Sequence, residues 1–416
     1  MMNIGDNTKL AIISVTNNGD RIAHKISNYY DADIYSRMYI KKNGIKKIVA
    51  KAFKKYRGII FIASTGIAIR AIAPFLKNKR EDPAVISIDN SGKYVISLVS
   101  GHLGGANELS LKIANIIDAE PIITTATDNL GIIAPDIIAK NNGLIIDDFR
   151  ICKHIASLLV YGKKVLFIDE DEIIRLPVGY VGRFKYDGCD YGKCEYNNNR
   201  YIHNNGECID YKNEYKDKNK DKNREYVDKN NEYDYVYEDN KCVYNYYGKI
   251  EGVVLITNKL NTNDVLVREI GNMHIGTNIP ILKLIRRNIV LGIGCRKNYD
   301  SLKMKENVLL ELEKYNIDKK AVNIISTIEI KKDEKAIIEL ANYLKCSINI
   351  FTVNEVKNVH KNYIGSDFVE RAIGVRAVCE PCVELTNAHL LTGKIKCDGM
   401  TLCLGKIKSK RFKEIL

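Results

Sequence analysis

Short apolar runs of strand length alternate with amphipathic helical patterns along most of the chain, and this alternation restricts the fold more than any other feature. The runs LAIISV (10–15), GIIFIA (58–63) and GVVLIT (252–257) have the length and composition of buried strands. Helical patterns lie between such runs, for example at about 45–55 and 105–117. Because strands that alternate with helices assemble into parallel sheets covered by helices, the sequence predicts an α/β protein with mainly parallel sheets flanked by helices.

The length of 416 residues exceeds what one ordinary core organises, so several domains are expected. We predict an N-terminal α/β domain at 1–140, a variable middle region at 141–285 and a separate C-terminal α/β domain at 286–416. Within the middle region, residues 185–248 contain 13 of the 25 Tyr and very few aliphatic side chains. Such a segment buries too little apolar surface to offset the entropy of ordering, so we predict a disordered or loosely ordered low-complexity insertion.

The net charge of +13 lies in the parts that are predicted to fold. Residues 185–248 hold 11 Lys and Arg against 14 Asp and Glu, which leaves 53 basic and 37 acidic side chains elsewhere. A basic fold suits an anionic ligand, whether nucleic acid, phosphate or a polycarboxylate. Because no nucleic-acid-binding motif accompanies the charge, we predict that nucleic acid is not the partner.

Location is predicted from what the sequence lacks. The first ten residues contain no secretory signal, and no apolar run approaches the roughly 18–20 residues of a membrane helix. Eleven Cys without secretory context indicate reduced thiols. We therefore expect a cytoplasmic protein that has no membrane partner.

Three loops each follow a buried strand and lead into a helix, the place where open α/β sheets bind ligands. The first carries Ser64, Thr65 and Gly66, with Arg70 one turn later. Small residues allow close approach of a ligand, a helix start attracts an anion, and Arg70 can clamp a carboxylate. A capped turn with a solvent-facing Arg is the alternative.

The second loop, residues 100–108, is the most informative. Its candidate site residues are Ser100, Gly101, His102, Gly104, Gly105, Asn107 and Glu108. The glycines permit close approach of the backbone to a ligand, and His102 titrates near neutral pH, which suits general acid–base catalysis. Glu108 is predicted to orient or supplement His102, although a structural His remains the alternative.

The third loop carries Gly294, Cys295, Arg296 and Lys297. We expect Gly294 to let a ligand approach and the two cations to bind it. Cys295 is a weaker candidate as a nucleophile, because no His that could activate it lies nearby in the sequence.

Two further segments are weaker candidates. Thr125 and Asp128 follow a short strand and either line the same cleft or cap a helix. Cys379 and Cys382 have CxxC spacing at the start of a helix predicted at about 380–389, yet no second CxxC follows, so buried thiols are favoured over zinc. Glu380 is predicted to be a helix cap or a ligand-facing carboxylate.

Together, these motifs resemble the cobalt-precorrin-5A hydrolases of anaerobic cobalamin biosynthesis. The resemblance rests on STGIAIRAIAP (64–74), SGHLGGANEL (100–109), TTATD (124–128) and GIGCRK (292–297), with GVRAVCEPCVEL (374–385) downstream. It covers roughly 55–150 and 288–408. The insertion at 185–248 and the residues Pro381 and Cys382 depart from what we expect of the family.

The resemblance implies a hydrolase that opens the ring A δ-lactone of cobalt-precorrin-5A and releases a two-carbon fragment as acetaldehyde, giving cobalt-precorrin-5B. It implies no cofactor and no protein-bound metal, because cobalt arrives inside the substrate. A homodimer and contacts with neighbouring enzymes of the pathway stay open.

For this reaction we predict His102 as the acid and base, supported by Glu108. The backbone N–H groups of Gly104 and Gly105 are predicted to stabilise an oxyanion, and Arg70, Arg296 and Lys297 to bind acetate and propionate carboxylates. The alternative is a non-catalytic tetrapyrrole-binding or carrier protein of the same pathway.

Overall fold

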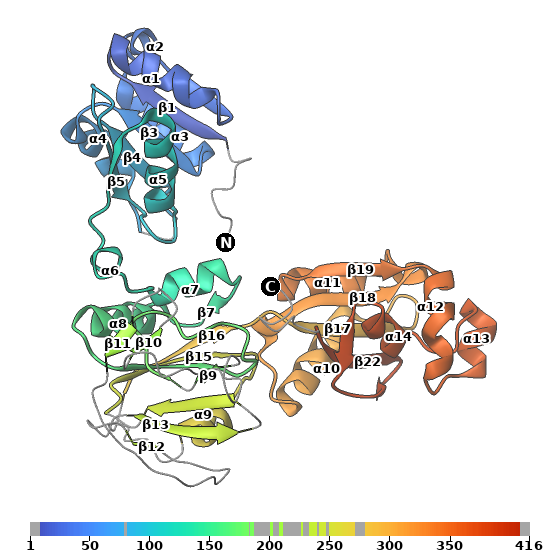
Figure 1. Cartoon of the computed structure of the whole chain (residues 1–416). Coiled ribbons are helices and arrows are strands. Elements are labelled where there is room, and N and C mark those ends of the chain that lie inside the picture. The colour runs from blue at the N-terminus through green and yellow to red at the C-terminus, as the bar shows by residue number, and fades with distance from the viewer. Residues whose placement is uncertain are drawn as a thin grey trace. The chain divides into compact units, whose positions relative to one another are not determined.

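A computed structural model describes residues 9–78, 81–182, 249–270 and 279–407, together with six short strands between 184 and 246 (Figure 1). The chain forms two compact units, Met1–Tyr161 and Gly162–Leu416. Most of the predicted insertion at 185–248 lies outside the described residues, and the domain boundaries at 140 and 285 stay predictions. No helix among the described residues is long and apolar enough to cross a membrane.

The first unit is built on a six-stranded sheet in the order β2-β1-β3-β4-β5-β6. The strands are β1 (Leu10–Ser14), β2 (Ala32–Tyr35), β3 (Gly58–Ile62), β4 (Ala84–Ile88), β5 (Tyr94–Val99) and β6 (Glu120–Ile122). The first four run parallel, β5 runs antiparallel to β4, and β6 runs parallel to β5.

Helices cover both faces of this sheet, which explains why its central strands are apolar throughout. On β1, Leu10 and Ile12 pack with α1 (Asn17–Ser27) and α5 (Ala106–Ile117), whereas Ala11 and Ile13 pack with α3 (Ile45–Lys55) and α4 (Thr65–Ile72). The unit also contains α2 (Arg37–Asn43), η1 (Ala73–Phe75), α6 (Ala126–Asn129), α7 (Pro135–Asn141), β7 (Ile145–Ile146) and α8 (Phe149–Val160).

The turn at Asn90-Ser91-Gly92 determines where two of the predicted loops lie. Gly92 has φ +74°, a conformation that favours glycine, and the chain reverses here from β4 into β5. The carboxyl end of β5 therefore lies at the opposite edge of the sheet from the carboxyl ends of β3 and β4. The expectation that loops 64–70 and 100–108 gather at one edge is wrong for this reason.

The second unit begins with a parallel sheet that contains β8 (Val165–Asp169), β15 (Gly252–Thr257) and β16 (Ile281–Ile285). Helix α9 (Asn263–Ile270) connects β15 to β16. The short strands between 184 and 246 are β9 (Phe184–Tyr186), β10 (Arg200–Ile202), β11 (Cys208–Asp210), β12 (Tyr226–Val227), β13 (Tyr233–Glu238) and β14 (Lys241–Tyr246).

A mixed sheet in the order β19-β18-β17-β22-β20, with β21 paired to β22, forms the rest of the second unit. Strands β17 (Ile289–Cys295), β18 (Val322–Ile328) and β19 (Ser347–Phe351) are parallel, and β20 (Ala388–Leu390), β21 (Ile395–Cys397) and β22 (Met400–Ile407) pair antiparallel. Its helical segments are α10 (Ser301–Lys314), η2 (Lys319–Ala321), η3 (Glu329–Lys331), α11 (Lys335–Leu344), α12 (Val353–Val359), η4 (His360–Asn362), α13 (Asp367–Ile373) and α14 (Cys379–Glu384). The helix predicted at about 380–389 is thus shorter, because the chain has entered β20 by residue 388. The two units confirm the predicted α/β class with mainly parallel sheets.

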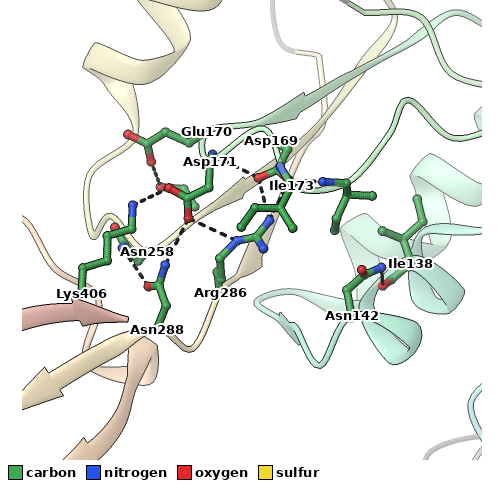
Figure 2. A network of polar contacts seen from close by, with 12 residues as sticks. Ile138, Asn142, Asp169, Glu170, Asp171, Ile173, Asn258, Arg286, Asn288 and Lys406 are labelled. Atoms are coloured by element: carbon green, nitrogen blue, oxygen red, sulfur yellow. Dashed lines mark hydrogen bonds and ion pairs between the residues drawn. The ribbon is translucent and has the colours of Figure 1, made fainter. Parts of the chain in front are cut away.

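A polar network joins the two sheets of the second unit (Figure 2). Arg286 binds both carboxylate oxygens of Asp169 at 2.7 Å, and its Nε lies 3.4 Å from Asp171. Asp171 also accepts a hydrogen bond from Asn288 at 3.1 Å and pairs with Lys406 of β22. These partly buried charges fix the end of β8 against the C-terminal sheet.

Candidate functional site

The loop that carries His102 is a tight turn closed by its own backbone. Ser100 has φ +60° and Gly105 has φ +85°, and the amides of Ala106 and Asn107 donate to the carbonyls of Ser100 and Gly101 at 3.1 Å. The Gly105 amide donates to the His102 carbonyl at 3.1 Å. The prediction that the Gly105 amide stabilises an oxyanion is therefore wrong for this loop conformation.

The imidazole of His102 lies between two carboxylates. Its Nε2 is 3.0 Å from Asp128 Oδ2, and its Nδ1 is 3.6 Å from Asp136 Oδ1. The hydroxyl of Thr127 lies 3.3 Å from Nε2. The reversal of β5 explains the first contact, because β6 runs parallel to β5 and brings the segment with Asp128 to the same edge. Of the two roles left open for Asp128, the structure shows a side chain that faces His102.

The surroundings of His102 change its acidity in opposite directions. Burial of the ring lowers the pKa of His102, while Asp136 and Asp128 raise it, and the net result is a pKa above the ordinary 6.5. Two carboxylates stabilise the imidazolium more than burial disfavours it. The ring is thus poised to exchange a proton near neutral pH.

Asn107 orients Asp128. Its Nδ2 donates to Asp128 Oδ2 at 2.9 Å and to the Thr125 hydroxyl at 3.0 Å, and its Oδ1 accepts from Ser97 at 2.7 Å. The side chain is buried and its partners are all within the protein. Both residues were predicted as ligand contacts; in the structure Asn107 binds the carboxylate that faces His102, and Thr125 accepts a hydrogen bond from Asn107.

Glu108 does not contact the His102 ring. Its carboxylate pairs with Lys112 at 3.2 Å and Lys140 at 3.3 Å. The prediction that Glu108 supports the imidazole is wrong, because one helical turn carries its side chain toward these cations. The carboxylates that contact the imidazole are those of Asp128 and Asp136.

Sequence reasoning missed Asp136 and Lys140, which both lie on α7. Asp136 faces His102 Nδ1, and the buried Lys140 lies 3.4 Å from the His102 carbonyl oxygen. The available signal was Pro135 at the first position of a helix, followed by an acid and, four residues later, a base.

The predicted site at 64–70 lies at the other edge of the same sheet. Ser64 precedes α4, its side chain caps no amide, and Arg70 is exposed, with its guanidinium 3.7 Å from where a Cβ of Gly66 would stand. These residues form an open helix start, and the structure does not bring them to His102.

In the second unit, Arg296 and Lys297 line a hollow of about 260 Å³. Asn298, Tyr299, Asp300, Lys303 and Asp398 complete its wall. The Arg296 guanidinium lies directly over Gly399, where an added Cβ would stand 2.1 Å from Nε, and donates to the Asp398 carbonyl at 3.2 Å. Because residue 399 is a glycine, the Arg296 guanidinium can lie against its backbone at the wall of the hollow.

Packing accounts for the glycines that precede Arg296. A Cβ on Gly292 would stand 1.9 Å from the Cys379 carbonyl, and one on Gly294 would stand 2.8 Å from the Thr401 hydroxyl. Gly292 thus makes room for α14, and Gly294, predicted to let a ligand approach, makes room for Thr401 of the neighbouring strand β22. Burial raises the pKa of Cys295 to about 11, so its thiol is a poor nucleophile at neutral pH.

The CxxC segment is a buried packing element. Burial raises the pKa of Cys379 to about 11 and that of Cys403 to about 12, which keeps both thiols protonated. Glu380 is buried, accepts the Lys394 amide at 3.1 Å and pairs with the Lys394 ammonium at 3.6 Å. The prediction of Glu380 as a substrate ligand is wrong, since its carboxylate is used inside the domain. Within the described residues, no group of His, Cys, Asp and Glu is arranged to hold a metal.

Comparison with protein families decides the relationship. Three models of one family match consecutive parts of the chain: cobalamin synthesis G N-terminal at 47–128, the cobalamin biosynthesis central region at 133–266, and cobalamin synthesis G C-terminus at 289–405. The chain belongs to the cobalt-precorrin-5A hydrolase family. His102 lies in the part of the chain that the N-terminal model matches, and Asp136, which it contacts, lies in the part that the central-region model matches.

Relatives of full length support the assignment. The chain is 25% identical to the cobalt-precorrin-5A hydrolase of Salmonella typhimurium, over 97% of this chain and 99% of the relative. It is 28% identical to the "Probable cobalt-precorrin-5A hydrolase" of Methanocaldococcus jannaschii, over 95% of this chain and 98% of the relative. A solved cobalamin biosynthesis protein G homolog from Sulfolobus solfataricus is 17% identical, covers 97% of this chain and 99% of its own, and has a TM-score of 0.35.

Proposed function

We propose that the chain hydrolyses cobalt-precorrin-5A in cobalamin biosynthesis. In this reaction the ring A δ-lactone opens, the methylated C20 carbon leaves as acetaldehyde, and cobalt-precorrin-5B results. The observation that carries the proposal is the ordered match of three parts of the chain to the cobalt-precorrin-5A hydrolase family. Cobalt belongs to the substrate.

The first step adds water to the lactone carbonyl. His102 takes a proton from the attacking water, and the lactone C–O bond breaks to give the ring A acetate and a C20 alcohol. Asp128 and Thr127 contact the ring nitrogen Nε2 at 3.0 and 3.3 Å and so hold the ring in place. General acid–base help of this kind contributes about 10²–10⁴-fold.

The second step breaks a C–C bond. Removal of the C20 hydroxyl proton forms the aldehyde C=O bond, and the electron pair of the broken C–C bond stays on the macrocycle, where a proton is added. One group that alternately accepts and returns a proton serves both steps. His102 fits this role because an imidazole can both accept and return a proton, and its two carboxylate neighbours support the protonated form.

Substrate carboxylates require cations. Arg296 and Lys297, with Lys303 at the same hollow, would bind acetate or propionate side chains of the tetrapyrrole. The Arg296 guanidinium can hold a carboxylate through two parallel hydrogen bonds.

Release of acetaldehyde from cobalt-precorrin-5A tests the proposal. The wild-type protein should release one acetaldehyde per substrate, and His102→Gln should release it at least about 10²-fold more slowly while still binding the substrate. His24→Gln, a change of the same chemistry at an exposed site on α1, is the matched control and should keep full activity. Full activity of His102→Gln contradicts the assignment of the base.

A tetrapyrrole carrier without catalysis is the alternative function, because the same cations would bind the same ligand. It predicts a shift of the absorption spectrum of the bound cobalt-precorrin and no aldehyde at any enzyme concentration. Both quantities can be followed in one incubation.

A further inference from the structure

We infer that Asp136 is a positioning residue that fixes the orientation of the His102 ring and supports its protonated form. This inference rests on the proposed role of His102 in catalysis. It gives the start of α7, which carries Asp136, a role in positioning the catalytic imidazole.

The two carboxylates beside His102 differ in their access to solvent. The side chain of Asp128 is 42% exposed, whereas that of Asp136 is 6% exposed. Nδ1 therefore faces an enclosed carboxylate, whereas Nε2 faces a more exposed one. A buried carboxylate on one ring nitrogen holds a catalytic imidazole in a fixed orientation.

Helix α7 holds His102 at two points. Asp136 and Lys140 are four residues apart and so lie on one face of the helix. Asp136 faces the ring, and Lys140 lies 3.4 Å from the His102 carbonyl and 3.3 Å from Glu108. The ring and the backbone of His102 are thus both positioned by the same helical face.

The contact between Asp136 and Nδ1 is an ion-pair distance, 3.6 Å, which exceeds a normal hydrogen bond. In enzymes without bound substrate, catalytic contacts are often long and shorten in the complex. The negative charge of Asp136 supports a proton on Nδ1 and so supports the protonated ring, whose second nitrogen, Nε2, faces Asp128 at 3.0 Å. The charged groups that face His102 from the packed elements are Asp128, Asp136 and Lys140, with Glu108 beyond Lys140.

Asp136→Asn tests the inference, because it removes the charge and keeps the shape. We expect kcat to fall by about 10²-fold with little change in KM. The acidic limb of the pH–rate profile should move to lower pH, because loss of the carboxylate lowers the pKa of His102. Glu120→Gln, which removes a carboxylate from the exposed edge strand β6 of the same unit, is the matched control and should change neither quantity.

A measurement without substrate separates this inference from the proposed function. NMR titration of the histidine side chains, with the His102 signal assigned by its loss in His102→Gln, should show a lower His102 pKa in Asp136→Asn than in the wild type. If His102→Gln retains full turnover, the proposed base and this inference both fail, even if the titration shifts. If His102→Gln is inactive but Asp136→Asn keeps the wild-type kcat, pH profile and titration, only this inference is overturned.

The variant Asp136→Glu distinguishes the positioning role of Asp136 from a purely structural role. It keeps the charge while it disturbs the packing, so a structural role predicts equal losses in the Asn and Glu variants with the pH profile unmoved. That result would overturn the inference. The positioning role predicts that only the Asn variant shifts the profile.

Discussion

The charged network in the second unit predicts a large and specific loss of stability in Arg286→Met. The guanidinium of Arg286 is 11% exposed and the carboxylate of Asp169 is 3% exposed, and they share two contacts of 2.7 Å (Figure 2). Methionine keeps much of the side-chain length and removes the charge. Asp169 then remains buried without its cation.

The structure sets the size of the effect. Removing one partner of a buried ion pair costs about 3–5 kcal/mol in free energy of unfolding. Asp169 keeps three backbone donors, the amides of Asp171, Ile173 and Ile174 at 3.2, 2.9 and 2.8 Å, and Asp171 keeps Lys406. These remaining donors favour the lower end, about 3 kcal/mol, which corresponds to a fall in Tm of about 6–12 °C for a unit of this size.

Urea unfolding followed by far-UV circular dichroism, together with calorimetry, measures the loss. Arg296→Met is the matched control, because Arg296 and Asp398 have side chains 71% and 73% exposed and an exposed pair contributes at most about 1 kcal/mol. The double variant Asp169→Asn/Arg286→Met should be less destabilised than the sum of its single changes. Equal losses in Arg286→Met and Arg296→Met would refute the reasoning.

Three further predictions follow from packing and acidity. Gly292→Ala should lower the free energy of unfolding by about 1–3 kcal/mol or more, because the added Cβ would stand 1.9 Å from the Cys379 carbonyl oxygen, and an unchanged Tm in thermal unfolding contradicts this. Burial raises the pKa of the Cys295 thiol to about 11, so Cys295 should react slowly with iodoacetamide near pH 7 until urea unfolds the protein. Mass spectrometry of its peptide measures the labelling, and rapid labelling of the folded protein contradicts the raised pKa. His102 has a folded-state pKa above its unfolded value of 6.5, so its contribution to stability is complete below that pH and is lost as the pH rises through the folded-state pKa. The stability difference between wild type and His102→Gln should therefore shrink as the pH rises above 6.5, and a difference independent of pH contradicts the pairing.

The strands and helices of the core could be predicted because their patterns are local. The apolar run at 58–63 became β3 (Gly58–Ile62), and the helical pattern at 45–55 became α3 (Ile45–Lys55). The helix predicted at about 380–389 was wrong at its end, because the helix ends at Glu384 and the chain enters β20 at Ala388. Pairing with β22 supplies the hydrogen bonds that a longer helix would have made internally.

The candidate site could be predicted only in part. His102 and Asp128 were both predicted as site residues, and they lie 3.0 Å apart. Glu108, six residues after His102 in the sequence, pairs with Lys112 and Lys140 instead. Asp136 was missed because its importance depends on where α7 packs, and no spacing within the sequence states that. Proximity in the chain proved a poor guide to which carboxylate reaches the imidazole.

The sequence by itself determined the α/β class, the family and the loop that carries His102, because each depends on residue types at short, ordered spacings. Only the tertiary structure decided which groups surround that imidazole. The hairpin at Asn90-Ser91-Gly92 reverses β5, which separates the loop of His102 from the loop of Arg70 and sets it against Asp128 and Asp136. Strand direction is a property of the whole sheet, so the partners of His102 follow from how the strands pair.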